Sequence, residues 1–205
     1  MTLGIFGGTF NPVHYGHLRA AEEVRELLGL ETVLFTPVNR PALKALDGEV
    51  SGEQRLEMLG LACNSNPAFK VLDCEIRRGG TSYSLHTIEH VWADYGERPT
   101  FILGQDAFDS IASWYEWRRL FELADFAVMT RPGSAPNLPA AVDFAAEIES
   151  GQYRTIFETN ISFVTVTALA ISSSQIRANL HAGRSIRYLV PEAVADYIKR
   201  ERIYV

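Results

Sequence analysis

The sequence predicts an α/β fold, a doubly wound and mostly parallel sheet with helices on both faces. Segments with strand-like and helix-like patterns alternate along the whole chain, as they do in parallel sheets with crossover helices. A glycine-rich loop within Gly7–His17 directly follows the first apolar segment, where sheets of this class bind ligands. No repeat, low-complexity tract or linker divides the 205 residues, so we expect residues 1–205 to form a single domain.

The first elements are a short strand and an amphipathic helix. Leu3–Phe6 is an apolar run, and from Leu18 onward Leu18, Ala21 and Val24 recur at helical spacing. The same patterns predict further strands at Thr32–Val38, Phe69–Ile76, Thr100–Leu103, Phe126–Thr130 and Ile161–Val166. They predict further helices at Ser51–Cys63, Leu85–Tyr95, Trp114–Leu123, Ala140–Ile148, Ser172–Leu180 and from Pro191 to near Arg202.

Three of these helices carry start signals. Ser51 is followed three residues later by Gln54, the spacing of a capping box. Ser172 is a typical N-cap residue, and Pro191 is expected in the first turn of the last helix.

Candidate ligand-binding loops follow three of the predicted strands. They begin after Phe6, after Leu103 and after Val166. Because the carboxyl ends of parallel strands lie at one edge of a sheet, we expect these loops to contribute to one shared site.

Composition and charge narrow the class of protein. A hydrophobic content of 47% and a charged content of 21% are ordinary for a globular domain, and the net charge of −6 argues against general binding of nucleic acid. No apolar run approaches the ~20 residues of a membrane span, and the chain enters a strand without a leader, so we expect a cytoplasmic protein that does not bind membranes. Cys63 and Cys74 do not make a disulfide framework; we expect both to be reduced and buried.

The loop between the first strand and the first helix has the residue types of a phosphate-binding site. Its glycines allow close approach of the backbone, and the following helix offers free N–H groups to an anion. His14 and His17, three residues apart, can face one phosphate together. Three alternatives remain: a turn that serves only packing, a helix start with hydrogen-bonded imidazoles, and a pair of metal ligands, for which no nearby cysteine or acid completes a set.

Two segments resemble the signatures of the nucleotidyltransferase superfamily. The first is His14-Tyr15-Gly16-His17 after the glycine-rich turn, and the second is Ile171–Arg177, in which Ser174 replaces the usual threonine of Ile-Ser-Ser-Thr-x-x-Arg. Within the superfamily the whole chain is similar to the bacterial nicotinate mononucleotide adenylyltransferases. Further similar segments are Ser82-Tyr83-Ser84, Gly104-Gln105-Asp106, Trp114-Tyr115, Arg131-Pro132 and Gly183–Pro191.

The resemblance implies a Rossmann-like fold and a defined reaction. The phosphate of nicotinate mononucleotide would attack the α-phosphorus of ATP in line, without a covalent enzyme intermediate, giving nicotinate adenine dinucleotide and pyrophosphate for NAD biosynthesis. The attacking oxygen is already anionic, so no general base is needed. Mg²⁺ would be bound through the ATP phosphates, without a dedicated set of protein ligands.

The resemblance also implies a role for each matching residue. The catalytic residues would be His14, His17, Lys44 and Arg177. The ATP-binding residues would be Gly7, Gly8, Thr9, Phe10, His17, Gly104, Asp106, Ile171, Ser172, Ser173, Ser174 and Arg177. The residues for the second substrate would be Lys44, Ser82, Tyr83, Ser84, Trp114, Tyr115 and Arg131.

One departure and several alternatives accompany this interpretation. The family usually has Pro-Pro-His-Lys where this chain has Pro41-Ala42-Leu43-Lys44, so a histidine is absent at Leu43. Without the resemblance, Trp114 would be a core residue, Asp106 and the serines helix caps, and Arg177 a surface residue. Alternative functions are transfer to nicotinamide mononucleotide, another transfer reaction of the superfamily, and nucleotide binding without turnover. The sequence is also compatible with a homo-oligomer.

Overall fold

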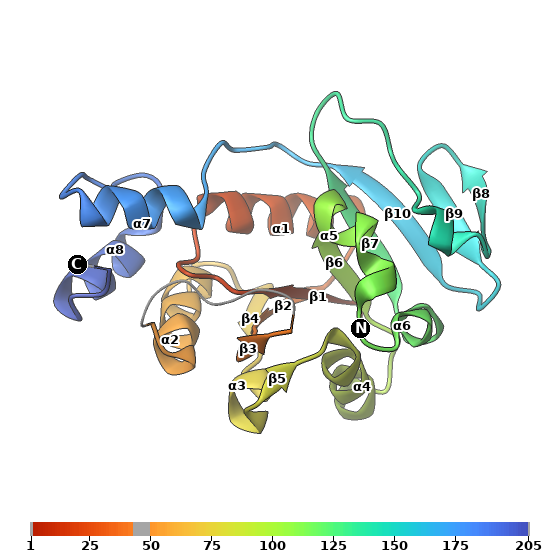
Figure 1. The fold of residues 1–205 in the computed structure, drawn as a ribbon, viewed down its shortest axis with the longest axis horizontal. Coiled ribbons are helices and arrows are strands. Elements are labelled where there is room, and N and C mark those ends of the chain that lie inside the picture. Colours follow the sequence, from red (N-terminus) through yellow and green to blue (C-terminus); the bar gives the residue numbers. More distant parts are fainter. Residues whose placement is uncertain (1, 43–49, 205) are drawn as a thin grey trace.

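A computed structural model describes residues 2–42 and 50–204 (Figure 1). Its centre is an eight-stranded sheet with the strand order β4-β2-β1-β6-β7-β10-β9-β8. The strands are β1 (Leu3–Gly8), β2 (Thr32–Pro37), β4 (Phe69–Val71), β6 (Thr100–Gly104), β7 (Asp125–Thr130), β8 (Ala145–Glu149), β9 (Gln152–Thr155) and β10 (Asn160–Thr165). The short strands β3 (Arg40–Pro41) and β5 (Thr81–Ser82) pair separately.

The sheet is mostly parallel, as predicted. Every pairing from β4 through β10 is parallel, and β1 lies between β2 and β6 with Phe6 opposite Phe35 and Ile102. The hairpin of β8 and β9 extends the sheet beyond β10 in antiparallel fashion. Because the six strands from β4 through β10 in this order run in one direction, the loops after β1, β6 and β10 lie at the same edge.

Helices cover both faces of this sheet, and alternate strand residues supply the two cores. On one face, Phe6 and Val33 pack with the helices α1 (Tyr15–Leu27), α2 (Gly52–Cys63), α7 (Ser173–His181) and α8 (Glu192–Arg200). On the other, Ile5 and Leu34 pack with α4 (Ser84–Tyr95), α5 (Gln105–Asp109) and α6 (Trp117–Leu123). Figure 1 shows α1 and α4 on opposite sides of the sheet, with α7 and α8 at one end and the β8–β9 hairpin at the other. The predicted doubly wound architecture is confirmed.

Two predicted helix starts are confirmed in detail. The Gln54 backbone N–H donates to Ser51 Oγ (3.2 Å), and the Ser51 N–H donates to Gln54 Oε1 (3.0 Å), which completes the capping box of α2. Ser172 caps α7 by accepting from the Gln175 N–H at 3.2 Å. Pro191 is the N-cap residue of α8, one position before the first turn in which we expected it.

The strand predicted over Phe69–Ile76 is too long. The strand β4 ends at Val71, and Cys74–Arg78 forms the short helix α3. The helix buries Glu75, whose carboxylate accepts a hydrogen bond from the Thr87 hydroxyl of α4. That partner lies twelve residues along the chain, so a local pattern does not contain it.

The helix predicted over Ala140–Ile148 is wrong. Only a 3₁₀ turn (η2, Ala140–Val142) precedes β8, and the chain reverses at Gly151, which has φ 76°, to form β9. Positive φ favours glycine, and this turn lets the segment complete the edge of the sheet.

The helix predicted from Trp114 begins three residues later. A 3₁₀ turn (η1, Ile111–Ser113) ends before Trp114, which is extended, and Glu116 has a left-handed φ of 44° directly before α6. This break places Trp114 outside the helix, where its side chain can line a cavity.

Both cysteines are free and buried, as expected. Cys63 lies in α2, whereas Cys74 lies in α3 instead of the predicted strand. Burial raises the pKa of the Cys63 thiol to about 12 and that of Cys74 to about 11. Among the residues that the structure describes, none of the helices combines the length and the apolar character needed to cross a membrane.

Candidate active site

The glycine-rich loop connects β1 to α1 by a compact path. Phe10 has a positive φ of 46°, and its ring folds back beneath Gly8. A Cβ atom at Gly8 would lie 3.0 Å from that ring, so a side chain at this position would displace it. The Asn11–Pro12 peptide bond is cis. The loop therefore turns tightly, with the Phe10 ring buried against its own backbone.

His14 and His17 lie against each other at the start of α1. Their rings are stacked, with centroids 3.7 Å apart and planes inclined by 25°. The His14 backbone N–H donates to His17 Nδ1 at 3.3 Å. Because Nδ1 accepts this bond, the proton of a neutral His17 lies on Nε2, which leaves that atom as an N–H donor.

Burial keeps both imidazoles uncharged. It lowers the pKa of His14 from 6.5 to about 4, and it lowers the pKa of His17 well below 6.5, with the neighbouring His14 acting in the same direction. Near neutral pH the pair therefore offers hydrogen-bond donors without net charge.

The second signature lies directly against this loop. Ser173 Oγ donates to the Pro12 carbonyl oxygen at 2.9 Å, and Arg177 Nη1 donates to the Asn11 carbonyl oxygen at 2.8 Å. Arg177 Nη2 lies 3.4 Å from Ser174 Oγ. The start of α7 thus faces the glycine-rich loop, as predicted from the shared edge of parallel strands, and brings a cation and hydroxyl donors to it.

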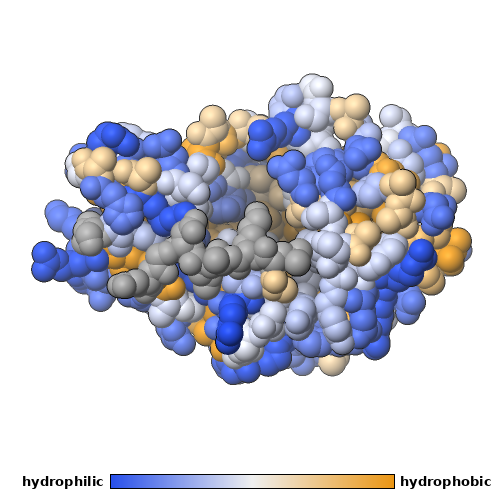
Figure 2. All heavy atoms as spheres, viewed as in Figure 1, coloured by the Kyte–Doolittle hydropathy of each residue, from blue (hydrophilic) through white to orange (hydrophobic). Residues whose placement is uncertain are grey.

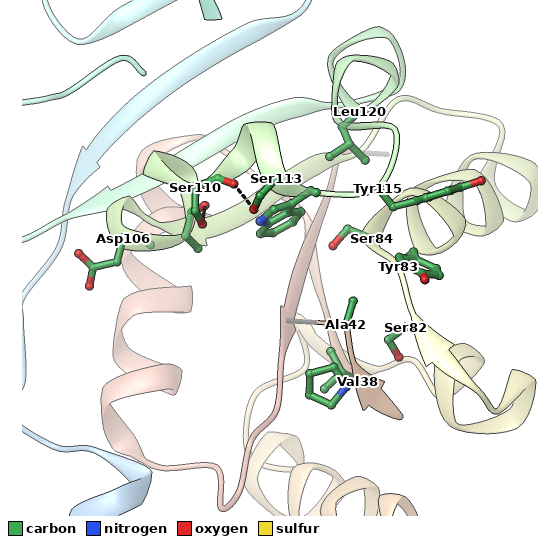
Figure 3. A pocket seen from close by; sticks show the side chains of 14 residues that line it. Val38, Ala42, Ser82, Tyr83, Ser84, Asp106, Ser110, Ser113, Tyr115 and Leu120 are labelled. Atoms are coloured by element: carbon green, nitrogen blue, oxygen red, sulfur yellow. Dashed lines mark hydrogen bonds between the residues drawn. The ribbon is translucent and has the colours of Figure 1, made fainter. Parts of the chain in front are cut away.

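A cavity of about 720 Å³ opens at the same edge of the sheet. Figure 2 shows that this face of the molecule is hollowed near its middle. The lining residues come from the loops after β2 and β6 and from the β5–α4 segment: Val38, Pro41, Ala42, Ser82, Tyr83, Ser84, Gly104, Asp106, Ala107, Ser110, Ser113, Trp114, Tyr115 and Leu120. Figure 3 shows Asp106, Ser110 and Ser113 across the cavity from Val38 and Ser82.

Aromatic side chains form much of the cavity wall. The Tyr83 and Tyr115 rings are 4.7 Å apart at an angle of 40°, and Trp114 meets Phe101 edge to face at 6.1 Å. The Trp114 ring is half-buried and lines the cavity. Its contact with Phe101 holds the ring in place.

The structure brings most of the predicted site residues together but leaves some apart. Gly104 and Asp106, predicted to bind ATP, line the same cavity as the residues predicted for the second substrate. Arg131 is exposed after β7 and is not among the residues that line this cavity. Leu43 and Lys44 lie outside the described residues. The roles assigned to individual residues stay predictions.

Sequence reasoning missed two residues that contact the loop. Arg55 donates to the Thr9 carbonyl oxygen at 2.9 Å, and the Tyr204 hydroxyl donates to Asn11 Oδ1. Arg55 could have been found, because it stands at helical spacing with Met58, Leu59 and Ala62 on the buried face of α2, where a charged residue is unusual. Tyr204 has no such signal, since its partner lies 193 residues away.

No group of three or more His, Cys, Asp or Glu side chains within residues 2–42 and 50–204 could hold a metal ion. The donors that do converge are N–H and hydroxyl groups, which suit phosphate oxygens.

Known proteins resemble this chain over its full length. Residues 5–179 match the family model described as cytidylyltransferase-like. The probable nicotinate-nucleotide adenylyltransferase of Geotalea daltonii is 44% identical over 212 residues, covering 100% of this chain and 98% of the relative. The protein of the same name from Geobacter sulfurreducens is 45% identical with the same coverage.

A solved structure has the same fold. It is Plasmodium falciparum nicotinic acid mononucleotide adenylyltransferase complexed with NaAD, which superposes with a TM-score of 0.71 over 99% of this chain and 97% of that chain. Because the two sequences are only 17% identical, this similarity shows a shared fold and nothing about function. The full-length relatives and the family model, together with the convergence of both signatures on one loop, show that the chain belongs to the cytidylyltransferase-like family and, within it, to the nicotinate-nucleotide adenylyltransferases.

Proposed function

We propose that this chain transfers the adenylyl group of ATP to nicotinate mononucleotide. A bond forms between a phosphate oxygen of the mononucleotide and the α-phosphorus of ATP, and the bond from that phosphorus to the oxygen bridging to the β-phosphate breaks. The products are nicotinate adenine dinucleotide and pyrophosphate. The observation that carries the proposal is the contact of Arg177 and Ser173 with the loop before His14 and His17, beside the aromatic cavity.

The chemistry requires that two polyanions meet in line while charge on the transferred phosphorus is stabilised. Positioning of this kind contributes up to ~7–11 kcal/mol, and a single donor aimed at developing charge about 3–4 kcal/mol. His17 Nε2–H is such a donor, and its neutral ring keeps the donor in place at physiological pH. Arg177 adds positive charge for the leaving pyrophosphate.

The cavity has groups for each part of the second nucleotide. Trp114 presents an aromatic face for stacking of a pyridine ring. The Asp106 carboxylate, which the resemblance assigns to ATP, lines the same cavity and can accept ribose hydroxyls of either nucleotide. Tyr83 and Ser84 begin α4, whose free N–H groups and helix dipole favour an anion. A carboxylate on the pyridine ring gains from these groups more than an amide does, so we expect nicotinate mononucleotide to be preferred over nicotinamide mononucleotide.

Magnesium enters this proposal as part of the ATP substrate. Mg²⁺ keeps several water ligands and is commonly bound through substrate phosphates, where it neutralises their charge. The described residues of the site fit this arrangement, since they are donors to phosphate and not a cluster of acidic ligands.

The test is release of pyrophosphate from MgATP, with nicotinate and nicotinamide mononucleotides supplied in parallel. We expect release with the acid and much less with the amide. The variant His17→Ala should bind MgATP and lose turnover by about 10²–10³-fold. His181→Ala, at the exposed end of α7, is the matched control and should keep full turnover.

Two results would contradict the proposal. Binding of MgATP without release with either mononucleotide would indicate a nucleotide-binding protein without this activity. Equal rates with acid and amide would contradict the role of the α4 amino terminus in selecting the carboxylate.

A further inference from the structure

Arg55 is a buried cation whose place in the core needs an explanation. Only 1% of its surface is exposed, and it lies on the apolar face of α2 beside Met58 and Leu59. Removing a guanidinium from water costs several kcal/mol, and an apolar residue of similar size would pack there at lower cost. The capping box at Ser51 fixes the start of α2 and with it the position of Arg55.

The partners of Arg55 are backbone carbonyl oxygens from two different loops. Nη1 donates to Thr9, in the loop after β1, at 2.9 Å and to Val38, in the loop after β2, at 2.7 Å. Nη2 donates to the Asn39 carbonyl oxygen at 3.2 Å. The planar guanidinium can bridge these oxygens in one fixed geometry, which a lysine ammonium cannot reproduce.

These two loops belong to opposite halves of the proposed site. Thr9 lies in the glycine-rich loop, next to the Phe10 that packs beneath Gly8. Val38 lines the aromatic cavity, and its N–H donates to the Gly8 carbonyl oxygen at 3.0 Å. Arg55 therefore lies where the glycine-rich loop meets the wall of the cavity, and it bonds to both.

Asn39 continues the connection along the same wall of the cavity, from Val38 to Ser82 (Figure 3). Its backbone N–H donates to Ser82 Oγ and its Nδ2 donates to the Gly80 carbonyl oxygen, both at 2.8 Å. Ser82 lines the cavity directly before Tyr83 and Ser84. A continuous set of hydrogen bonds thus runs from Thr9 through Arg55 and Asn39 to the segment that begins α4.

We propose that Arg55 is a positioning residue for adenylyl transfer, which holds the glycine-rich loop and the cavity wall at a fixed distance so that the two bound nucleotides meet in line. This inference rests on the proposed function. Because Arg55 is buried and bonds to the backbone of both loops, we expect its loss to change their relative placement more than the affinity of either half-site. Misplacement of reacting groups by about 1 Å costs roughly 100-fold in rate.

The experiment compares Arg55→Met, Arg55→Lys and the control Arg154→Met, an exposed position on β9. Folding is checked by circular dichroism, and each protein is assayed well below its own unfolding temperature. We expect kcat to fall about 100-fold in Arg55→Met and less in Arg55→Lys, with the Kd of MgATP alone and of nicotinate mononucleotide alone changed by less than about threefold. Arg154→Met should match the wild type.

Amide hydrogen exchange supplies a readout that does not depend on turnover. Exchange should increase at both Gly8–Phe10 and Val38–Ala42 in the Arg55 variants, and not in the control. If the wild type shows no turnover, the proposed function fails while exchange still decides whether Arg55 joins the two loops. A kcat within about threefold of wild type in a folded Arg55 variant, or increased exchange in only one segment, overturns the inference. The inference is also overturned if the fall in kcat is fully explained by a smaller fraction of folded protein. If Arg55→Met does not fold, the kcat and the exchange of Arg55→Lys test the inference.

Discussion

Mild acid should destabilise this protein through His14. The folded-state pKa of His14 is lowered to about 4, because burial disfavours the charged ring, whereas the unfolded chain binds the proton near pH 6.5. Between these two values the unfolded state holds a proton that the folded state lacks. The stability associated with the neutral ring is therefore complete above pH 6.5 and decreases as the pH falls toward 4.

The magnitude follows from the two pKa values. The full difference corresponds to about 3 kcal/mol, of which about 2 kcal/mol is lost between pH 7.5 and pH 5. His17 contributes in the same direction, since burial and the neighbouring His14 both lower its pKa. Carboxylates titrate in this range as well, so the measurement compares variants instead of using one curve.

The assay is urea unfolding of the wild type, His14→Gln and His181→Gln at several pH values from 7.5 to 5, analysed by linear extrapolation. Glutamine cannot take up a proton, so the free energy of unfolding of His14→Gln should fall by about 2 kcal/mol less than that of wild type over this range. His181, exposed at the end of α7, is the control and should leave the wild-type slope unchanged. If the free energies of unfolding of wild type and His14→Gln fell equally with pH, burial of the neutral His14 ring would not explain the acid sensitivity.

Three further substitutions test packing, two of them in the site and one on the surface of α2. Gly16→Ala would place a Cβ atom 3.0 Å from the His14 ring, so steady-state kinetics should show a lower kcat with little change in unfolding temperature; an unchanged kcat would mean that the ring moves without consequence. Gly60 is exposed on α2, and a Cβ atom added there would meet no atom within 4 Å outside the backbone of the helix itself. Gly60→Ala should therefore raise the free energy of unfolding by about 0.5–1 kcal/mol, and a loss of stability would contradict this reasoning. Trp114→Ala should weaken binding of the pyridine mononucleotide by about 1–3 kcal/mol in calorimetry and leave MgATP binding unchanged, whereas Trp114→Phe should recover part of the loss; equal weakening of both ligands would place the stacking elsewhere.

Much of the fold could be predicted because its signals are local. The capping box of Ser51 and Gln54 lies within one helical turn, and the mostly parallel direction of the strands follows from the alternation of strands and helices. The convergence of Ser173 and Arg177 on the glycine-rich loop also follows, since the carboxyl ends of parallel strands share one edge.

Predictions failed where distant contacts outweigh local pattern. The Thr87 hydroxyl bonds to the buried Glu75 of α3, and nothing in the sequence around Cys74 indicates this partner. The hairpin of β8 and β9 forms because β10 offers an open sheet edge, and the Gly151 turn was the local signal for it.

The sequence predicted which types of residue form the candidate site better than it predicted where their side chains lie. Trp114 was assigned to a helix, although the left-handed Glu116 excludes it from α6 and leaves it free to line the cavity. The position of Arg55 on the apolar face of α2 was a signal that it is buried, but its partners are backbone atoms, which no side-chain pattern identifies.

The contacts around Asn11 join distant parts of the chain. Arg177 and Tyr204, which bond to Asn11, lie 166 and 193 residues after it. During synthesis the ribosome therefore makes the glycine-rich loop long before these partners. A growing chain that ends before Arg177 and Tyr204 therefore lacks the guanidinium and the hydroxyl that bond to Asn11. Under the proposed function, ATP would stabilise chains in which these contacts have formed and would leave chains that lack them open to proteolysis.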